Sequence, residues 1–149
     1  MSTLAKNKRA TYDYNIIKEF EAGLVLSGAE VKSVKLGHLS MKGSFISIKE
    51  KKVIIKNMYI SKYQPSGDKQ KSYNPNKDRE ILLNTKEIQY LKGKMTKNGL
   101  TIIPISVYTT RRLIKVKIAL VKGKKKFDKR EAIKNKDIKM NIARKLKNN

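Results

Sequence analysis

Cysteine and tryptophan are absent from this 149-residue sequence, and histidine occurs once. The lack of cysteine excludes disulfide bonds and thiolate zinc sites. The single His38 has no HExxH pattern and no glycine-rich phosphate loop around it. The acidic residues mostly stand alone among lysines, whereas metal-dependent nucleases need clustered carboxylates. We therefore interpret the chain as a binding protein and not an enzyme, and we expect no catalytic residue, no metal site and no cofactor.

Long apolar segments are also missing. No run of about 18 apolar residues is present, so we expect nothing in the chain to span a bilayer. The basic start at residues 1–9 is not followed by the apolar part of a signal peptide. A helix that lies on a membrane favours Leu, Phe and Trp, but this chain has three Phe and no Trp. We expect a cytoplasmic protein without a membrane partner, and membrane-surface binding is the least favoured alternative.

Positive charge is present in large excess. Lys and Arg number 36 against 12 Asp and Glu, a formal net charge of +24. Such self-repulsion destabilises a compact chain unless a polyanion neutralises it, so nucleic acid is the expected partner. Residues 122–149 hold +9 of this +24, which leaves +15 for the preceding 121 residues. We predict a basic N-terminal arm at 1–10, one folded domain at 11–122 and a basic C-terminal tail at 123–149.

Alternating apolar residues before the tail predict β-strands. Between Lys115 and Val121, apolar positions alternate with Lys115 and Lys117, which predicts a half-buried strand with a basic outer surface. Similar runs, separated by turn-forming residues, occur at 12–26, 45–48, 53–63, 79–83 and 100–108. Six short strands of this kind need a closed or nearly closed sheet.

Two short helices are expected between these strands. Ser27-Gly28-Ala29-Glu30 has the form of a capping box, so a helix should begin there and stop at Gly37. A second helix should begin with Thr85 as its capping residue and end at Gly93. The order of elements predicts a mainly β fold, an OB-type six-stranded β-barrel with short flanking helices.

Two acids stand out in the basic chain. Glu19 and Glu21 flank Phe20 and form a local negative spot. Pairing with nearby lysines is one explanation for both carboxylates. The small residues Ala22 and Gly23 follow Glu21 and let a ligand backbone come close. Glu21 is therefore alternatively a candidate acceptor for a base edge or a ribose 2′-hydroxyl.

Motifs from residue 7 onward form a set whose order and spacing are familiar. They are Asn7-Lys8-Arg9-Ala10, the run Phe20–Ser33, Ile81–Asn84, Lys115–Lys125 and Asp128-Lys129-Arg130. Together they resemble the SmpB family, the SsrA-binding proteins of bacteria. The resemblance implies an OB-type barrel that binds the tRNA-like domain of transfer-messenger RNA (tmRNA) and delivers it, with elongation factor Tu, to stalled ribosomes. A general basic RNA-binding or ribosomal protein is the alternative that charge alone also fits.

The resemblance implies RNA-binding roles for residues in four of these motifs. The expected tmRNA-binding residues are Asn7, Lys8, Arg9, Glu21, Ala22, Gly23, Leu82, Asn84, Lys115 and Lys117. Lys115 and the N-terminal arm are also placed by their chemistry to meet phosphate, whereas Leu82 is equally well interpreted as barrel core. The chain departs from the family at Arg79-Glu80, where Arg-Lys is usual, and this departure bears on one phosphate contact.

The tail is expected to act on the ribosome. In the family it becomes helical in the empty mRNA channel near the small-subunit decoding centre, and translation then switches to the reading frame of the RNA. Apolar residues at i, i+4 and i+8 predict a helix that is marginal on its own. Phe127 replaces the usual Tyr or His, so it can stack on a base but cannot donate a hydrogen bond. The expected ribosome-binding residues are Gly123, Lys124, Lys125, Lys126, Phe127, Asp128, Lys129, Arg130, Lys134, Ile138 and Ile142.

Overall fold

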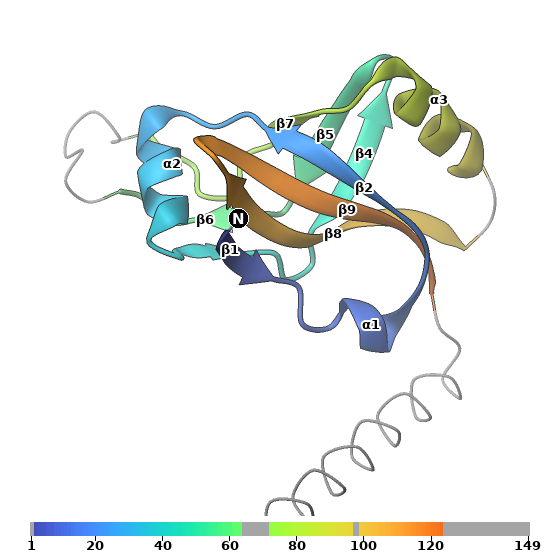
Figure 1. Cartoon of the computed structure of the whole chain (residues 1–149), viewed down its shortest axis with the longest axis horizontal. Helices are drawn as coiled ribbons and strands as arrows, with labels where there is room; N and C mark the ends of the chain where they lie inside the picture. The colour runs from blue at the N-terminus through green and yellow to red at the C-terminus, as the bar shows by residue number, and fades with distance from the viewer. Residues whose placement is uncertain (1, 64–71, 97–98, 124–149) are drawn as a thin grey trace, which may run out of the picture.

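The structure is a computed structural model that describes residues 2–63, 72–96 and 99–123 (Figure 1). This part of the chain forms nine strands and three helices. In chain order they are β1 (Ser2–Lys6), α1 (Ala10–Asp13), β2 (Tyr14–Leu24), α2 (Gly28–Lys35), β3 (Leu39–Ser40), β4 (Phe45–Lys49), β5 (Lys52–Lys56), β6 (Tyr59–Ile60), β7 (Arg79–Leu82), α3 (Thr85–Lys94), β8 (Leu100–Thr110) and β9 (Leu113–Gly123).

One antiparallel sheet contains seven of these strands, in the order β1-β8-β9-β2-β7-β5-β4. The long strands β2, β8 and β9 lie side by side at its centre, and β4 also comes close to β8, which curls the sheet toward closure. β3 and β6 form a separate two-stranded sheet. Helices α2 and α3 lie at opposite ends of the assembly (Figure 1). The prediction of a mainly β, barrel-like fold is confirmed, but the main sheet has seven strands where six were expected.

The apolar core lies inside the curled sheet. Residues that alternate along β9 point into it, and α2 and α3 each add one fully buried side chain, Val34 and Leu91. A second, smaller cluster covers the opposite side of the sheet, where α1 packs on β8 and β9. This cluster buries Ala119 and Val121 on the same side of β9 that exposes Lys117. The outer face is therefore basic at one end of β9 and apolar at the other.

The six predicted runs correspond to strands of the structure, with four differences. Residues 12–13 belong to helix α1, which was not predicted, so the strand expected from residue 12 begins at Tyr14. Residues 53–63 are not one strand, because Asn57 has a positive φ of 62° and divides the run into β5 and β6. Neither β3 nor β1 was predicted. β1 lies within the segment expected to be a basic arm, and there it pairs with β8 along its length.

Both helices after β2 begin with a capping box. The Ser27 hydroxyl accepts from the Glu30 N–H at 3.2 Å and the Glu30 carboxylate accepts from the Ser27 N–H at 3.1 Å, which confirms the predicted start of α2. The predicted start of α3 was wrong by one residue. Asn84 is the cap, because its side-chain oxygen accepts from the Glu87 N–H at 2.8 Å, and Thr85 is the first helical residue. The helix ends one residue beyond the predicted Gly93.

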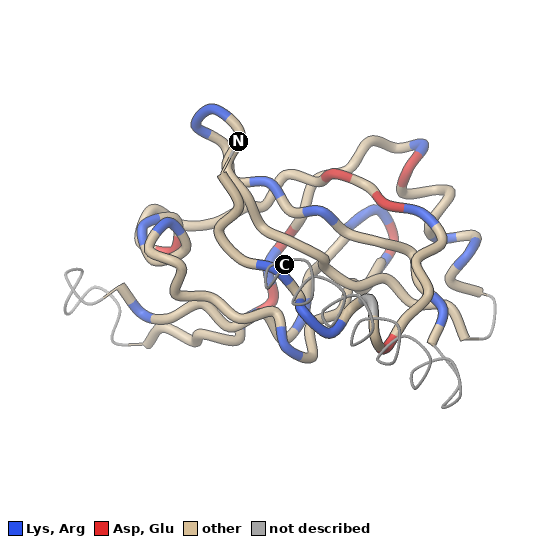
Figure 2. The backbone as a smooth tube through the Cα atoms, turned by 60° about the horizontal axis from the view of Figure 1, so that its bottom comes forward, with Lys and Arg blue, Asp and Glu red and all other residues tan. Residues whose placement is uncertain are grey.

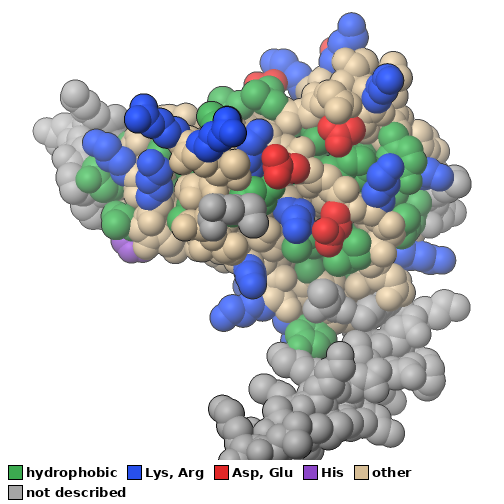
Figure 3. All heavy atoms as spheres, viewed as in Figure 1, with side chains coloured by type: hydrophobic (Ala, Val, Ile, Leu, Met, Phe, Trp, Pro, Cys, Tyr) green, Lys and Arg blue, Asp and Glu red, His purple; other side chains and the backbone are tan. Residues whose placement is uncertain are grey.

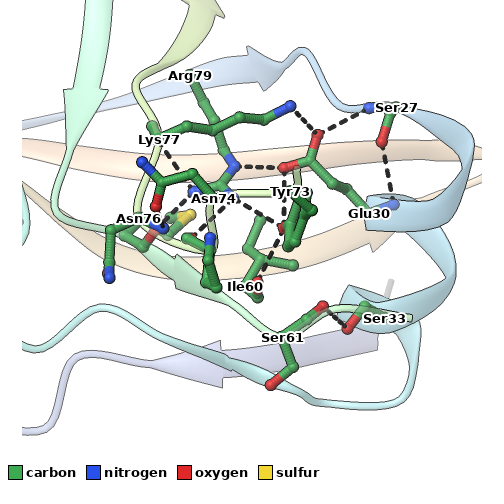
Figure 4. Close-up of polar contacts among 12 residues, drawn as sticks. Ser27, Glu30, Ser33, Ile60, Ser61, Tyr73, Asn74, Asn76, Lys77 and Arg79 are labelled. Carbon is green, nitrogen blue, oxygen red and sulfur yellow. Dashed lines mark hydrogen bonds and ion pairs between the residues drawn. The ribbon is translucent and has the colours of Figure 1, made fainter. Parts of the chain in front are cut away.

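A buried polar network ties α2 to the strand β7 and the segment before it (Figure 4). Arg79 is fully buried, and its Nε donates to the Glu30 carboxylate at 2.6 Å. Its remaining donors bond the Tyr73 hydroxyl and the carbonyl oxygens of Met58, Pro75 and Lys77. A guanidinium has five N–H groups, so every one is satisfied inside the protein. Arg79 is therefore a structural residue, unavailable to a phosphate.

The same network keeps Glu30 ionised. Burial alone would raise its pKa, because a low dielectric disfavours the charged form. The hydrogen bond from the Ser27 N–H, together with Arg79 and Lys77, outweighs burial and holds the pKa of Glu30 below its ordinary value. Lys77 contributes an ammonium 3.4 Å from the carboxylate. The network thus contains a charge-assisted pair that is shielded from water.

Candidate nucleic-acid interface

Strand register brings the predicted residues of three motifs into one row on the outer face. Gly23 of β2 lies opposite Leu82 of β7 on one side and Lys115 of β9 on the other. Lys115 in turn lies opposite Tyr108 of β8. The row therefore runs Leu82, Gly23, Lys115, Tyr108 across four strands. Glu21 lies two residues from Gly23 along β2, on the same face, since side chains two apart in a strand share a face.

The carboxylates on this face are paired with lysines across the strands. Glu19 Oε2 lies 3.7 Å from Lys117 Nζ, and Glu21 Oε1 lies 4.0 Å from Lys115 Nζ. The explanation of Glu19 as a lysine partner is confirmed. Glu21 is also paired, yet its side chain stays 56% exposed. Exposed ion pairs contribute about 0–1 kcal/mol, so these charged groups can exchange partners with a ligand at little cost.

The Glu21 carboxylate has a second partner, the hydroxyl of Tyr108, which donates to Oε2. Tyr108 is only 4% exposed, in contrast to Glu21. Its burial, and then its hydrogen bond to and the negative charge of Glu21, raise the pKa of the Tyr108 phenol well above its ordinary value. The hydroxyl therefore remains a proton donor at neutral pH.

Leu82 adds an apolar side chain to the row, and Gly23 adds a position without a side chain. Leu82 is 58% exposed, so its interpretation as barrel core is wrong. A Cβ added to Gly23 would lie 3.6 Å from the Leu82 Cβ, an ordinary contact, so the protein itself leaves room for a larger residue. Ala22 is 1% exposed and belongs to the core, so its side chain cannot touch a ligand on this face.

The basic N-terminal motif lies elsewhere on the surface. Asn7 has a structural task, because its amide side chain donates to the Pro104 carbonyl at 3.0 Å and its N–H to the Ile105 carbonyl at 2.7 Å. Lys8 and Arg9 are exposed. They help line a cavity of about 740 Å³ between this segment and the β3–β4 loop. None of the residues in the row lines this cavity.

Two further predicted residues have places in the structure. Asn84 caps α3 through its side-chain oxygen, which gives it a structural role. Gly123 is exposed and ends β9, where it pairs with Tyr14. The other predicted tail residues lie outside the described part of the chain: Lys124, Lys125, Lys126, Phe127, Asp128, Lys129, Arg130, Lys134, Ile138 and Ile142.

The charge distribution suits a polyanionic ligand. Lys and Arg positions occur on all sides of the chain trace (Figure 2), and acidic side chains lie among lysines on the face viewed in Figure 3. Within residues 2–63, 72–96 and 99–123, no three His, Cys, Asp or Glu side chains gather to hold a metal ion. No helix in this part of the chain is long and apolar enough to cross a membrane.

Sequence reasoning did not select Tyr108 as a functional residue. It ends the predicted strand 100–108, and an aromatic residue in a strand is usually packed in the core. A register shift between Pro104 and Ser106 changes the phase of β8, so counting by two from the start of the strand does not show which face Tyr108 occupies.

The fold and the outer face define a small, strongly basic β-barrel protein with a polar surface across its central strands, as in barrels that bind nucleic acid. A family model described as SmpB protein matches residues 4–148, and the chain belongs to the SmpB family. The SsrA-binding protein of Persephonella marina is 44% identical over 147 residues, which cover 99% of this chain and 95% of that protein. The SsrA-binding protein of Thermosipho africanus is 43% identical over 150 residues, which cover 100% and 99%.

A solved structure supports the same assignment. It is described as "tmRNA-SmpB: a journey to the center of the bacterial ribosome" and superposes with a TM-score of 0.67 at 34% sequence identity. The match covers 87% of this chain and 93% of the other. The likeness thus extends over most of the described barrel.

Proposed function

We propose that this protein binds tmRNA and acts with it on ribosomes in trans-translation. The full-length relatives are SsrA-binding proteins, and the similar solved structure is of tmRNA and SmpB in the ribosome. The observation that carries the proposal for this chain is the row on the outer face. Three motifs that are far apart in sequence supply Glu21, Gly23, Leu82 and Lys115 to neighbouring positions.

These four residues offer a nucleic acid complementary contacts. Lys115 supplies a cation for a phosphate, and Glu21 supplies acceptors for a base edge or a 2′-hydroxyl. Leu82 offers exposed apolar surface for a base or ribose, and Gly23 lets a backbone pass close to the sheet. The pairing of β2 with β7 and with β9 sets the positions of these residues relative to one another.

We further propose that the tail at 123–149 binds the small-subunit decoding centre and the empty mRNA channel. Elongation factor Tu would join through the RNA complex, and the protein would act in the cytoplasm without catalysing a reaction. The support for this proposal is the tail's net charge and the resemblance of Asp128-Lys129-Arg130 to the family. Separate tasks for barrel and tail predict separable defects.

The decisive experiment compares the full chain with a form truncated after Gly123. RNA copurified from cells should be enriched in tmRNA for both proteins, whereas only the full chain should restore tagging of nascent chains in cells that lack the native protein. A large loss of tmRNA affinity on truncation would contradict the division of tasks. Stoichiometric copurification with every ribosomal subunit, without a preference for tmRNA, would instead identify a general ribosomal protein.

A further inference from the structure

The contact between Tyr108 and Glu21 joins a buried side chain to an exposed one. Tyr108 is held between neighbours on both sides, since β8 pairs with β1 through Thr3 and with β9 through Lys115. Its phenol has few accessible conformations, while a free glutamate on a strand has many. The hydroxyl bonds Oε2 of Glu21. The position of the exposed carboxylate is therefore set from within the sheet.

The Lys115 ammonium does not perform this task. It lies 4.0 Å from Glu21 Oε1, too far for a hydrogen bond, and a lysine side chain is itself flexible. An ionised carboxylate offers about four lone-pair sites, of which the tyrosine hydroxyl takes one. Oε1 thus keeps its acceptor sites beside Lys115 and next to the open position at Gly23.

We infer that Tyr108 is a positioning residue of the RNA interface, which holds the Glu21 carboxylate in place so that it can accept hydrogen bonds from the RNA. The inference rests on the proposed function, in which Glu21 contacts RNA. Tyr108 does not contact the RNA itself and acts only through Glu21. A glutamate that is already ordered in the free protein loses less conformational entropy when RNA binds, so the affinity is higher.

The test is a double-mutant cycle on the full chain with the tRNA-like domain of tmRNA as the probe. We expect Glu21→Ala to weaken binding about tenfold or more, as for the loss of a charged hydrogen-bond acceptor. Tyr108→Phe, which removes one oxygen atom, should weaken binding by about threefold to tenfold. In the Glu21→Ala background, Tyr108→Phe should have no further effect, because the residue through which it acts is gone.

Tyr59→Phe is the matched control, because Tyr59 is exposed in the small β3–β6 sheet and lies outside the row. Its RNA affinity should equal that of the unmodified protein. Thermal unfolding of each variant tests whether the fold is retained. A loss of affinity that merely followed a loss of stability would persist in the Glu21→Ala background and would overturn the inference.

A measurement on the free protein tests the contact between Tyr108 and Glu21 separately from RNA binding. The Tyr108 13Cζ resonance of the free protein should move when Glu21 is replaced by Ala, and an unmoved resonance would overturn the contact itself. If Glu21→Ala weakens RNA binding and Tyr108→Phe does not, the positioning role is wrong while the proposed function stands. If neither the unmodified protein nor its variants prefer tmRNA over other RNAs, the proposed function fails and the inference falls with it.

Discussion

Replacement of Arg79 by Met should destabilise the protein strongly, because it removes one partner of a buried ion pair. Five donor groups of Arg79 are satisfied within the protein, and the Glu30 carboxylate that loses its partner is only 2% exposed. Loss of one member of a buried pair typically costs about 3–5 kcal/mol. At roughly 2–4 °C per kcal/mol for a chain of this size, Tm should fall by about 6–20 °C.

Urea denaturation and thermal unfolding, both followed by circular dichroism, measure this loss. Arg9→Met is the matched control, because Arg9 makes an exposed ion pair with Asp13 at 3.5 Å and its side chain is 71% exposed. The control should change stability by less than about 1 kcal/mol. The double variant Glu30→Gln with Arg79→Met keeps a residue that can complete the capping box but removes the buried charge that has lost its Arg79 partner. It should therefore recover part of the loss.

The same pair makes a pH-dependent contribution to stability. Since the folded-state pKa of Glu30 is lowered below its ordinary value of 4.5, the contribution is complete above that value and is lost as pH falls through the lowered pKa. The stability difference between the unmodified protein and Arg79→Met should therefore shrink in acid. Equal stability of Arg79→Met and Arg9→Met at neutral pH would refute the reasoning, as would a difference that grows on acidification.

Three further variants test the outer face. Gly23→Ala should leave the unfolding temperature unchanged or slightly raised, since the protein accommodates the added Cβ. Its tmRNA binding should weaken, because the RNA backbone is expected to pass close to Gly23. Unchanged affinity would contradict that close approach. Lys115→Ala should lower the affinity for tmRNA in filter-binding assays. It should also reduce the slope of log K against log salt concentration by about 0.7–0.9, the amount for one phosphate contact. An unchanged slope would exclude a contact between Lys115 and a phosphate. Leu82→Ala should cost less than about 1 kcal/mol of stability in urea denaturation, whereas Ile81→Ala, its buried neighbour, should cost about 2–5 kcal/mol; similar costs would contradict the exposed placement of Leu82.

Much of the barrel was predictable because local patterns and tertiary packing agree. Alternation located the central strands, and the Ser27–Glu30 capping box located the start of α2, since its hydrogen bonds span only three residues. The predictions failed where two local signals competed. Asn84 and Thr85 are both good capping residues, and Asn84 is the cap because Glu87, three residues later, completes a capping box with it. β1 lacked a strong pattern of its own and depends on pairing with β8, which lies about a hundred residues away.

The sequence by itself determined the class of partner and the family, because net charge and motif order are properties of the chain whatever its conformation. Only the tertiary structure decided which residues share a surface. Register places Leu82, Gly23 and Lys115 side by side, turns Ala22 inward and adds Tyr108 to the row. The tertiary structure also keeps Arg79 off the surface, because its guanidinium donates hydrogen bonds to the Glu30 carboxylate and to the buried Met58 carbonyl. These assignments depend on pairings between distant strands, and a shift of one residue would exchange the two faces.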